Sequence, residues 1–407
     1  MSTSLRQPRK VLHVFNGAGG GAALSTIGLI ESFRAQGIEA CAVCHEMGSQ
    51  QERDILFDAL DGQVLFAPLY WWNHKIRAKR WKRPLIELRQ LLKTRWMRRS
   101  AAQVTEFAHS QGADLIHTNT ILTPEGGLAA RRLGLPHVWH LRELVGPGNA
   151  FRLQYEGPAL GRYLATHCSK LIANSQVTAA QVRDWLPADL LEVIPNGIDL
   201  ARFRSRANLS HRETVVVAMV GDLHSRSKNH ALFIEAVARL DRSLPLEFRI
   251  YGRDPSLGGK VHGDAYVAQL HQLIESHGLQ SRFRWPGFVA DPACIMSEID
   301  VLVHPAEGES FGRVVVEAMA ASLPVVGVRG GGVGEIIAAD VTGLVAKPND
   351  PGDLAGQIDR LVRDVALRGI MGFAGRQRAE LNYSLAACAA QVLRVYGDAL
   401  ALPLANC

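Results

Sequence analysis

Apolar and polar residues follow one rhythm along most of the chain. Short apolar runs bounded by Gly, Pro, Asn or Asp alternate with longer segments of helical periodicity, such as 22–36. This alternation predicts parallel β-sheets covered by helices on both faces, which is an α/β fold. The predicted strands are 11–16, 39–45, 63–67, 114–117, 137–140, 170–173, 214–220, 247–251, 282–285, 300–304, 324–328 and 343–346.

The strands fall into two series, which predicts two doubly wound domains. Residues 203–212 are polar and charged, so we place the linker there and predict domains at 1–205 and 206–384. A length of 407 residues agrees with two domains. In parallel α/β sheets, ligands bind beyond the carboxyl ends of the strands, so we expect the binding site in a cleft between the two domains.

Composition narrows the classes of protein. No apolar run approaches the roughly 18 residues of a membrane-spanning helix, and the basic start of the chain lacks a signal-peptide core. The six cysteines are scattered, without the spacing of a metal cluster. Cys41 and Cys44 lie in an apolar run, which favours buried strand residues over a redox pair. These features predict a cytoplasmic protein.

The stretch from Glu309 to Glu317 carries the most specific chemistry. It follows the predicted strand 300–304 and leads into a predicted helix, 314–321. The start of that helix, near Phe311, offers unpaired backbone N–H groups and the positive end of a dipole, which together suit a diphosphate. Glu309 and Glu317 can accept hydrogen bonds from hydroxyls on either side of it. A nucleotide-sugar has hydroxyls at both places.

Several further motifs accompany this stretch in order along the chain. They are 193–199, 228–230, 318–326, 330–337 and 342–345. In combination they resemble the retaining glycosyltransferases of family 4. The resemblance implies the GT-B fold, with two Rossmann-like domains facing each other across a cleft. It also implies that a C-terminal helix, 385–402, packs on the first domain.

The resemblance implies roles for individual residues. Glu309 should bind hydroxyls of the donor sugar, and Glu317 should bind the ribose diol. Lys228 should contact the diphosphate and offset charge on the departing nucleoside diphosphate. The remaining groups implied to hold the diphosphate are Gly20, Gly21, Ser310, Phe311, Gly312 and Arg313.

Two positions leave alternatives open. Asp222 stands where the family usually has an arginine, and an acid beside a diphosphate is repulsive. Either Arg226 supplies the missing charge or Asp222 points away. His140 ends a predicted strand at the place where the family has a histidine near the transferred sugar. A purely structural histidine is equally compatible with that position.

The glycine-rich loop 17–22 admits a different function. Read alone, it is nearly the dinucleotide fingerprint, which would make the chain a Rossmann-type NAD-dependent oxidoreductase. That fingerprint needs an acid at the end of the next strand, and the nearest, Glu46, lies late. The motifs of the second half favour a nucleotide-sugar instead. A tight turn without a ligand also remains compatible with the loop.

The segment from Trp71 to Arg99 is basic and rich in tryptophan. Between Lys75 and Arg99 it has eleven Lys or Arg residues and one acid, Glu87. Such a segment can lie on an anionic membrane or lipid-linked acceptor, bind nucleic acid, or form a solvated basic face. The net charge of +6 suits any anionic partner. We favour the membrane, and no nucleic acid.

Together these features predict a retaining glycosyltransferase that uses a nucleotide-sugar donor and a glycan or lipid-linked acceptor. Bacterial relatives in this family build lipopolysaccharide or other surface polysaccharide, so that pathway is the expected one. No Asp-x-Asp motif occurs, so we expect no metal and no cofactor. The predicted location is cytoplasmic, peripheral on the inner face of the cell membrane. A non-catalytic protein that binds nucleic acid or a partner is the other alternative.

Overall fold

The computed structural model of the chain divides into two compact units. Unit 1 comprises Met1–Gly197 and Leu385–Cys407, and unit 2 comprises Ile198–Ser384. The structure describes residues 7–74, 83–146, 149, 151–205, 213–223, 225–254 and 264–402. The division therefore falls after Gly197, rather than after residue 205, where the sequence placed it.

Unit 1 is built on a seven-stranded parallel sheet with the strand order β3-β2-β1-β5-β6-β8-β9. Its strands are β1 (Lys10–Phe15), β2 (Glu39–His45), β3 (Val64–Ala67), β5 (Leu115–Thr118), β6 (His137–Leu141), β8 (Lys170–Ala173) and β9 (Leu191–Val193). A short antiparallel pair, β4 (Asn73–His74) and β7 (Arg152–Leu153), stands apart from this sheet.

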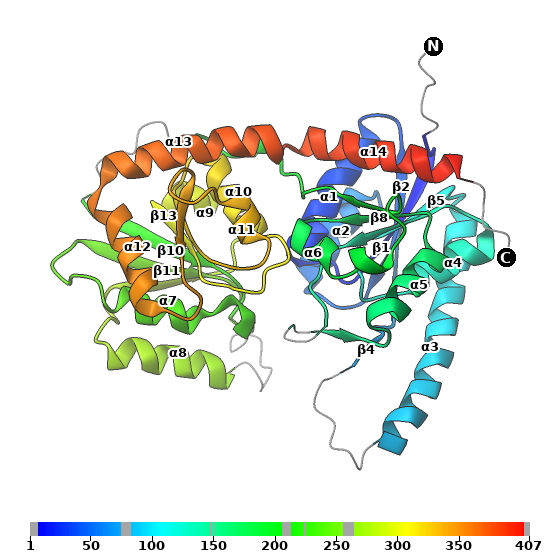
Figure 1. Cartoon of the computed structure of the whole chain (residues 1–407), viewed down its shortest axis with the longest axis horizontal. Coiled ribbons are helices and arrows are strands. Elements are labelled where there is room, and N and C mark those ends of the chain that lie inside the picture. The colour runs from blue at the N-terminus through cyan, green and yellow to red at the C-terminus, as the bar shows by residue number, and fades with distance from the viewer. Residues whose placement is uncertain are drawn as a thin grey trace. The chain divides into compact units, whose positions relative to one another are not determined.

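Helices cover both faces of the unit 1 sheet (Figure 1). They are α1 (Gly20–Arg34), α2 (Gln50–Ala59), α3 (Arg83–Ser110), α4 (Glu125–Leu133), α5 (Gly157–His167), α6 (Gln176–Ala180) and α14 (Leu385–Ala401), with the 3-10 turn η2 (Arg183–Trp185). Side chains alternate along a strand, so Leu12 and Val14 of β1 pack toward α3 and α4, whereas Val11 packs with α1 and α14. The C-terminal helix thus contributes to the core of the first unit, with Tyr396 fully buried.

Unit 2 repeats the plan with six parallel strands in the order β12-β11-β10-β13-β14-β15. The strands are β10 (Val215–Val220), β11 (Leu246–Tyr251), β12 (Phe283–Gly287), β13 (Val301–His304), β14 (Val325–Val328) and β15 (Gly343–Ala346). Val217 and Met219 enter one hydrophobic core, and Val216 and Ala218 enter the core on the opposite face.

The helices of unit 2 lie on both faces of its sheet (Figure 1). They are α7 (His230–Val237), α8 (Asp264–Ser276), α9 (Pro292–Glu298), α10 (Arg313–Ala320), α11 (Val333–Ile336), α12 (Pro351–Arg363) and α13 (Val365–Asn382), with 3-10 turns η3 (Leu200–Arg202) and η4 (Arg226–Lys228). Two Rossmann-like α/β units follow from these sheets, as predicted. Every strand predicted from the sequence is present, with bounds that differ by at most two residues.

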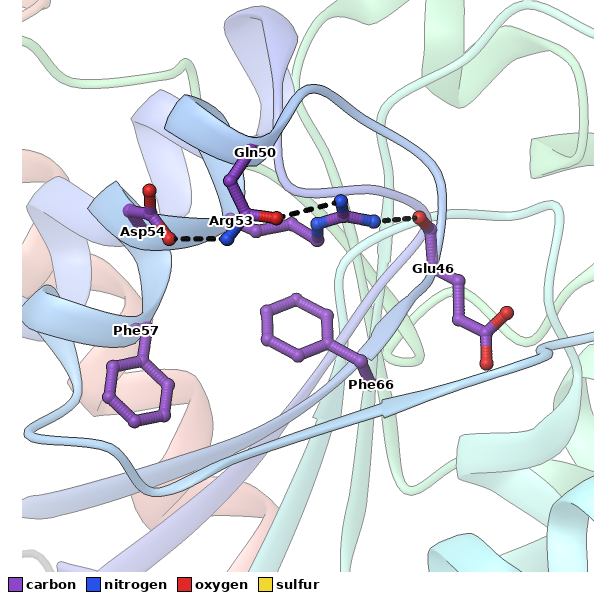
Figure 2. Close-up of a pocket in the computed structure, with 6 residues that line it drawn as sticks. All are labelled: Glu46, Gln50, Arg53, Asp54, Phe57 and Phe66. Atoms are coloured by element: carbon purple, nitrogen blue, oxygen red, sulfur yellow. Dashed lines mark hydrogen bonds between the residues drawn. The ribbon is translucent and has the colours of Figure 1, made fainter.

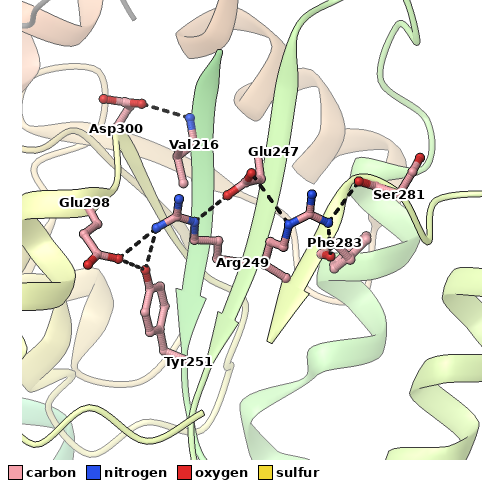
Figure 3. A network of polar contacts seen from close by, with 9 residues as sticks. Val216, Glu247, Arg249, Tyr251, Ser281, Phe283, Glu298 and Asp300 are labelled. Carbon is pink, nitrogen blue, oxygen red and sulfur yellow. Dashed lines mark hydrogen bonds and ion pairs between the residues drawn. The ribbon is translucent and has the colours of Figure 1, made fainter. Parts of the chain in front are cut away.

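Polar contacts join β11 to Glu298, the last residue of α9, and β10 to Asp300, just before β13 (Figure 3). Arg249 donates from Nε to Glu247 Oε1 at 2.6 Å and from Nη1 to Glu298 Oε2 at 2.8 Å. The Tyr251 hydroxyl donates to the same Glu298 oxygen at 2.9 Å. Asp300 accepts from the backbone N of Val216 at 2.8 Å. These contacts fix the start of β13, the strand that leads to Glu309.

The structure bears on two features of the sequence, the pair of cysteines in the second predicted strand and the lack of a long apolar run. Cys41 and Cys44 are buried in β2, as predicted, and burial raises the pKa of each thiol to about 12. Among the described residues, no helix combines the length and the hydropathy needed to cross a bilayer.

Candidate functional site

The candidate site in unit 2 lies where its strand order reverses direction. β10 pairs with β11 on one side and with β13 on the other, so the loops that follow β10 and β13 leave the sheet at this reversal. In open parallel sheets, a crevice forms at such a point. Lys228 follows β10 and Glu309 follows β13, so the fold brings both predicted residues to one place.

Lys228 and Glu309 are in direct contact. The Lys228 ammonium donates to Glu309 Oε2 at 2.6 Å, and both side chains are largely shielded, at 28% and 22% exposure. His304, the last residue of β13, places Nε2 3.5 Å from the same carboxylate oxygen. The sequence did not single out His304, although its place at the end of the strand before Glu309 was a usable signal.

The electrostatics of this cluster keep Glu309 ionised. Burial acts to raise the pKa of its carboxyl, but the Lys228 ammonium and the His304 ring together hold that pKa well below its usual range. An ionised carboxylate accepts hydrogen bonds and donates none. Glu309 is therefore suited to receive hydroxyl donors from a ligand.

The start of α10 forms the second part of the site. Gly312 precedes the helix with φ of 99°, a conformation that glycine adopts readily, and a Cβ there would approach Val333 Cγ2 to 2.8 Å. The Phe311 side chain is buried against Tyr383, so only its backbone can face a ligand. Arg313 donates to Glu317 Oε1 at 2.7 Å, one turn along α10. This contact orients the carboxylate that was predicted to bind ribose.

A second glycine-rich loop supports Glu309 from behind. The backbone N of Gly332 donates to the carbonyl of Glu309 at 2.7 Å. A Cβ at Gly331 would come within 2.4 Å of that carbonyl, and one at Gly332 would come within 2.5 Å of the carbonyl of Ser310. Only glycine permits this close approach of the two backbones. The loop 330–332 therefore positions the Glu309 loop.

Asp222, in the loop after β10, pairs with Arg253. Its carboxylate accepts from the backbone N of Arg253 at 2.9 Å and from the Arg253 guanidinium at 3.2 Å. Arg226 lies elsewhere, with its guanidinium 4.6 Å from the centre of the Tyr266 ring. The acid at position 222 is thus held by an arginine from the neighbouring loop, a partner that the sequence did not suggest.

In unit 1, His140 belongs to a buried histidine cluster. His13, His117 and His140 project from β1, β5 and β6, and the ring centres lie 5.3 Å apart for His13–His117 and 5.4 Å apart for His117–His140. Arg142 donates to His140 Nδ1 at 3.2 Å, and His117 Nδ1 lies 2.6 Å from the Tyr396 hydroxyl. His140 is only 1% exposed within this unit.

Burial keeps these rings neutral. Together with the nearby Arg142 guanidinium, it lowers the pKa of His13 to about 3 and that of His140 well below its usual range. Burial also lowers the pKa of His137 to about 4. In the unfolded chain, these histidines titrate near pH 6.5. Unit 1 should therefore lose stability as the pH falls from about 6.5 toward 3, because only the unfolded chain then takes up protons freely.

We expect His13→Gln to reduce the acid sensitivity of the protein. Between pH 7.5 and 5, the His13 ring accounts for about 2 kcal/mol of lost stability. The gap between the urea unfolding midpoints at pH 7.5 and 5.0 should therefore narrow in His13→Gln by the share of this one ring, while the other buried histidines keep theirs. His109→Gln, which alters an exposed histidine of α3, is the matched control and should behave as the wild type. An unchanged pH dependence in His13→Gln would show that the buried cluster does not drive acid unfolding.

The glycine loop of unit 1 is shaped by a carboxylate. A Cβ at Gly19 would fall 1.5 Å from Glu52 Oε1, so this glycine allows the acid to pack against the loop. Gly20 has φ of 82°, begins α1 and is exposed, as is Gly21. Their predicted contact with a diphosphate stays a prediction, and the Glu52 carboxylate beside the loop is an unfavourable neighbour for an anion.

Part of the basic segment belongs to the core rather than to the surface. Trp72 is 3% exposed and stacks on Trp139 with ring centres 5.7 Å apart, so it cannot contact a membrane. Trp96 on α3, in contrast, is 60% exposed. Residues 75–82 and the side chains of 73–94 lie outside the described part of the structure, and with them most of the basic residues of the segment.

A separate hollow of about 520 Å³ lies on unit 1, beside α2 and β3 (Figure 2). Phe57 and Phe66 form its apolar walls, and Arg53 donates across it to Gln50 Oε1 and to the carbonyl of Glu46, both at 3.0 Å. None of the predicted site residues lines this hollow. In the parts of the chain that the structure describes, no group of three or more His, Cys, Asp or Glu could hold a metal ion. Metal independence stays a prediction.

Comparisons with known proteins agree with the two-unit architecture. The family described as "Glycosyl transferases group 1" matches residues 202–378, and "Glycosyltransferase Family 4" matches residues 19–202. The D-inositol 3-phosphate glycosyltransferase of Salinispora arenicola is 30% identical over 322 residues, 71% of this chain and 69% of that protein. The enzyme of the same name from Salinispora tropica is 29% identical, and the match spans 71% of this chain but only 64% of that protein.

Among solved structures, Alr3699/HepE of Anabaena, in complex with UDP and glucose, superposes with a TM-score of 0.73 at 23% identity. The superposition covers 95% of this chain and 99% of that protein. At this identity, the likeness supports the fold.

Proposed function

Because the chain belongs to the family 4 glycosyltransferases, which have the GT-B fold, we propose that it transfers a sugar from a nucleotide-sugar donor with retention of anomeric configuration. The acceptor would be a hydroxyl of a glycan or a lipid-linked glycan. Synthesis of bacterial surface polysaccharide or lipopolysaccharide is the setting we propose. The observation that carries the proposal is the contact between Lys228 and Glu309 at the strand reversal of unit 2.

The residues of this cluster divide the chemistry between them. The bond between the anomeric carbon and the phosphate oxygen breaks, and a bond from the acceptor oxygen forms on the same face of the sugar. The acceptor proton passes to the departing phosphate oxygen, so no protein base is needed. Lys228 then stabilises the negative charge that grows on the nucleoside diphosphate, while Glu309 holds hydroxyls of the sugar.

The nucleotide is bound by the α10 side of the site. Glu317, 5% exposed and oriented by Arg313, would accept hydrogen bonds from the two ribose hydroxyls. The backbone N–H groups at the start of α10 would receive the diphosphate. HepE was solved with UDP, so UDP is the first nucleotide to test. No metal enters this scheme, and activity should persist in EDTA.

Donor hydrolysis tests the proposal without knowledge of the acceptor. Purified protein is incubated with UDP-glucose, GDP-mannose or ADP-glucose, and released nucleoside diphosphate is quantified. We expect one donor to be turned over slowly, and faster when glycolipid extract is added. Turnover of no donor, together with tight binding of NAD⁺, would favour the oxidoreductase alternative.

The basic segment supports a proposed peripheral attachment to the cytoplasmic face of the membrane. Each Lys or Arg near an anionic surface contributes about 1 kcal/mol, and tryptophans such as the exposed Trp96 favour the headgroup boundary. Replacing Lys79, Arg80, Lys82 and Arg83 with Gln should release the protein from phosphatidylglycerol vesicles in flotation assays. Nucleotide binding should be unaffected. Wild-type protein that fails to float with anionic vesicles at low salt would end the membrane proposal.

A further inference from the structure

Four neighbouring strands of unit 2 end in a row of charged and aromatic side chains, which contact one another in two groups. Phe288 follows β12, Arg253 follows β11, and the Arg253 guanidinium lies 4.3 Å from the centre of the Phe288 ring. The same guanidinium bonds Asp222, which follows β10, at 3.2 Å. A separate contact joins Lys228, which also follows β10, to Glu309 after β13 at 2.6 Å.

Close backbone approach brings the loop of Arg253 and the stem of Lys228 together around Gly221. A Cβ at Gly252, the residue before Arg253, would fall 2.1 Å from the carbonyl of Gly221. A Cβ at Gly221 would in turn fall 2.9 Å from the Lys228 side chain. Gly221 is therefore sandwiched between the Arg253 loop and the stem of Lys228. Both cations stand at the carboxyl edge of the sheet, on either side of one glycine.

The charges in these loops favour a second cation beside Lys228, because each of the two carboxylates offsets one positive charge. Asp222 and Glu309 are two carboxylates, and a diphosphate placed beside Lys228 would face both of them. Two unpaired unit charges of the same sign about 4 Å apart repel by about 4 kcal/mol at an effective dielectric constant of about 20. Arg253 offsets Asp222 at 3.2 Å, and Asp222 in turn fixes the position of the guanidinium. The stacking on Phe288 restrains the same group from the other side.

We propose that Arg253 is the second cation that binds the donor diphosphate, so that the charge expected at position 222 is supplied by the neighbouring loop through the Asp222–Arg253 pair. This inference rests on the proposed function and specifies which residues of the site bind the diphosphate. Arg226 is a weaker source of that charge, because it is exposed and lies over Tyr266. Arginine suits the task because its fork can bond a carboxylate and a phosphate at once.

The test compares a nucleoside diphosphate with its own nucleoside by calorimetry. The probe is whichever of UDP, GDP and ADP the wild type binds most tightly, with uridine, guanosine or adenosine as its phosphate-free partner. Arg253→Met keeps the apolar contact with Phe288 but removes the charge. It should weaken diphosphate binding at least about tenfold and leave nucleoside binding within about twofold. Arg253→Lys, which keeps the charge but lacks the fork, should recover part of the diphosphate affinity.

Arg360→Met is the matched control, because Arg360 bonds Asp340 at the same 3.2 Å, just before β15 and thus at the opposite edge of the sheet. It should bind both probes as the wild type does. Equal losses for diphosphate and nucleoside, or equal losses in Arg253→Lys and Arg253→Met, would assign Arg253 a structural role and overturn the inference. Unchanged affinity in Arg253→Met would overturn it as well.

Failure of the inference and failure of the proposed function give different results. If Lys228→Ala weakens diphosphate binding and Arg253→Met does not, the donor site stands and only the role of Arg253 falls. If the wild type binds none of the three nucleoside diphosphates, the proposed function itself falls. Should Arg253→Met not fold, Arg253→Gln removes the charge while its amide can still donate to Asp222. A loss of diphosphate affinity of about tenfold in that variant supports the inference, and unchanged affinity contradicts it.

Discussion

Replacing Lys228 with alanine is expected to lower turnover about a hundredfold, the scale of losing one preorganised charge donor at a leaving group. The ammonium lies 2.6 Å from Glu309 Oε2, at the point where the strand order of unit 2 reverses. Its removal leaves the Glu309 carboxylate without its cation and, under the proposed function, takes one positive charge from the departing diphosphate. Steady-state turnover of the best donor is the measurement.

Arg226→Ala is the control that distinguishes a specific role of Lys228 from a general effect of positive charge in this loop. Arg226 belongs to the same 3-10 turn as Lys228 but lies over the Tyr266 ring. We expect its loss to affect turnover much less. Equal damage from Arg226→Ala would transfer the role to that residue. If neither change matters, the diphosphate does not bind in this loop.

Replacing Glu317 with alanine should weaken nucleoside diphosphate binding at least about tenfold. The carboxylate accepts a hydrogen bond from Arg313 at 2.7 Å and is almost fully buried. A ribose hydroxyl bound there would donate to a charged acceptor that is shielded from water. A lost hydrogen bond to a charged group costs about 1.5–3 kcal/mol. Calorimetry with the best-bound nucleoside diphosphate measures the effect.

Glu380→Ala is the matched control for this change. Glu380 also bonds an arginine one helical turn away, at 2.6 Å from Arg376, but on the exposed side of α13. Its removal should leave nucleotide affinity as in the wild type. Glu317→Ala that binds nucleotide normally would remove this residue from the site.

The sequence predicted the fold well because both sheets are parallel and buried on two faces. Each such strand is a continuous apolar run between helices, as 170–173 and 343–346 illustrate, and those two were predicted with the observed bounds. The strands that were missed, β4, β7 and β9, have two or three residues each, too few to show a period. Tertiary contacts also determine where the two units divide. Residues 198–205 mix apolar and polar side chains, and they belong to unit 2 because Ile198 and Phe203 pack into its core.

The sequence placed candidate site residues in particular loops but could not show which side chains pair. Motif spacing placed Lys228 and Glu309 in loops after two strands, and the strand order brought them together. Spacing could not show that Asp222 pairs with Arg253, because the two are separated by a helix and a strand and meet only through adjacency of β10 and β11. The burial of Trp72 could not be predicted for the same reason, because it depends on stacking with Trp139, which lies far away in the sequence.

Thermal unfolding of the wild type with UDP, GDP, ADP and NAD⁺ tests the central claim most directly. A ligand present at a hundred times its Kd stabilises the folded state by about 2.7 kcal/mol. We expect one nucleoside diphosphate to raise the Tm by several degrees and NAD⁺ to leave it unchanged. A rise with NAD⁺, and none with any of the three nucleoside diphosphates, would contradict it.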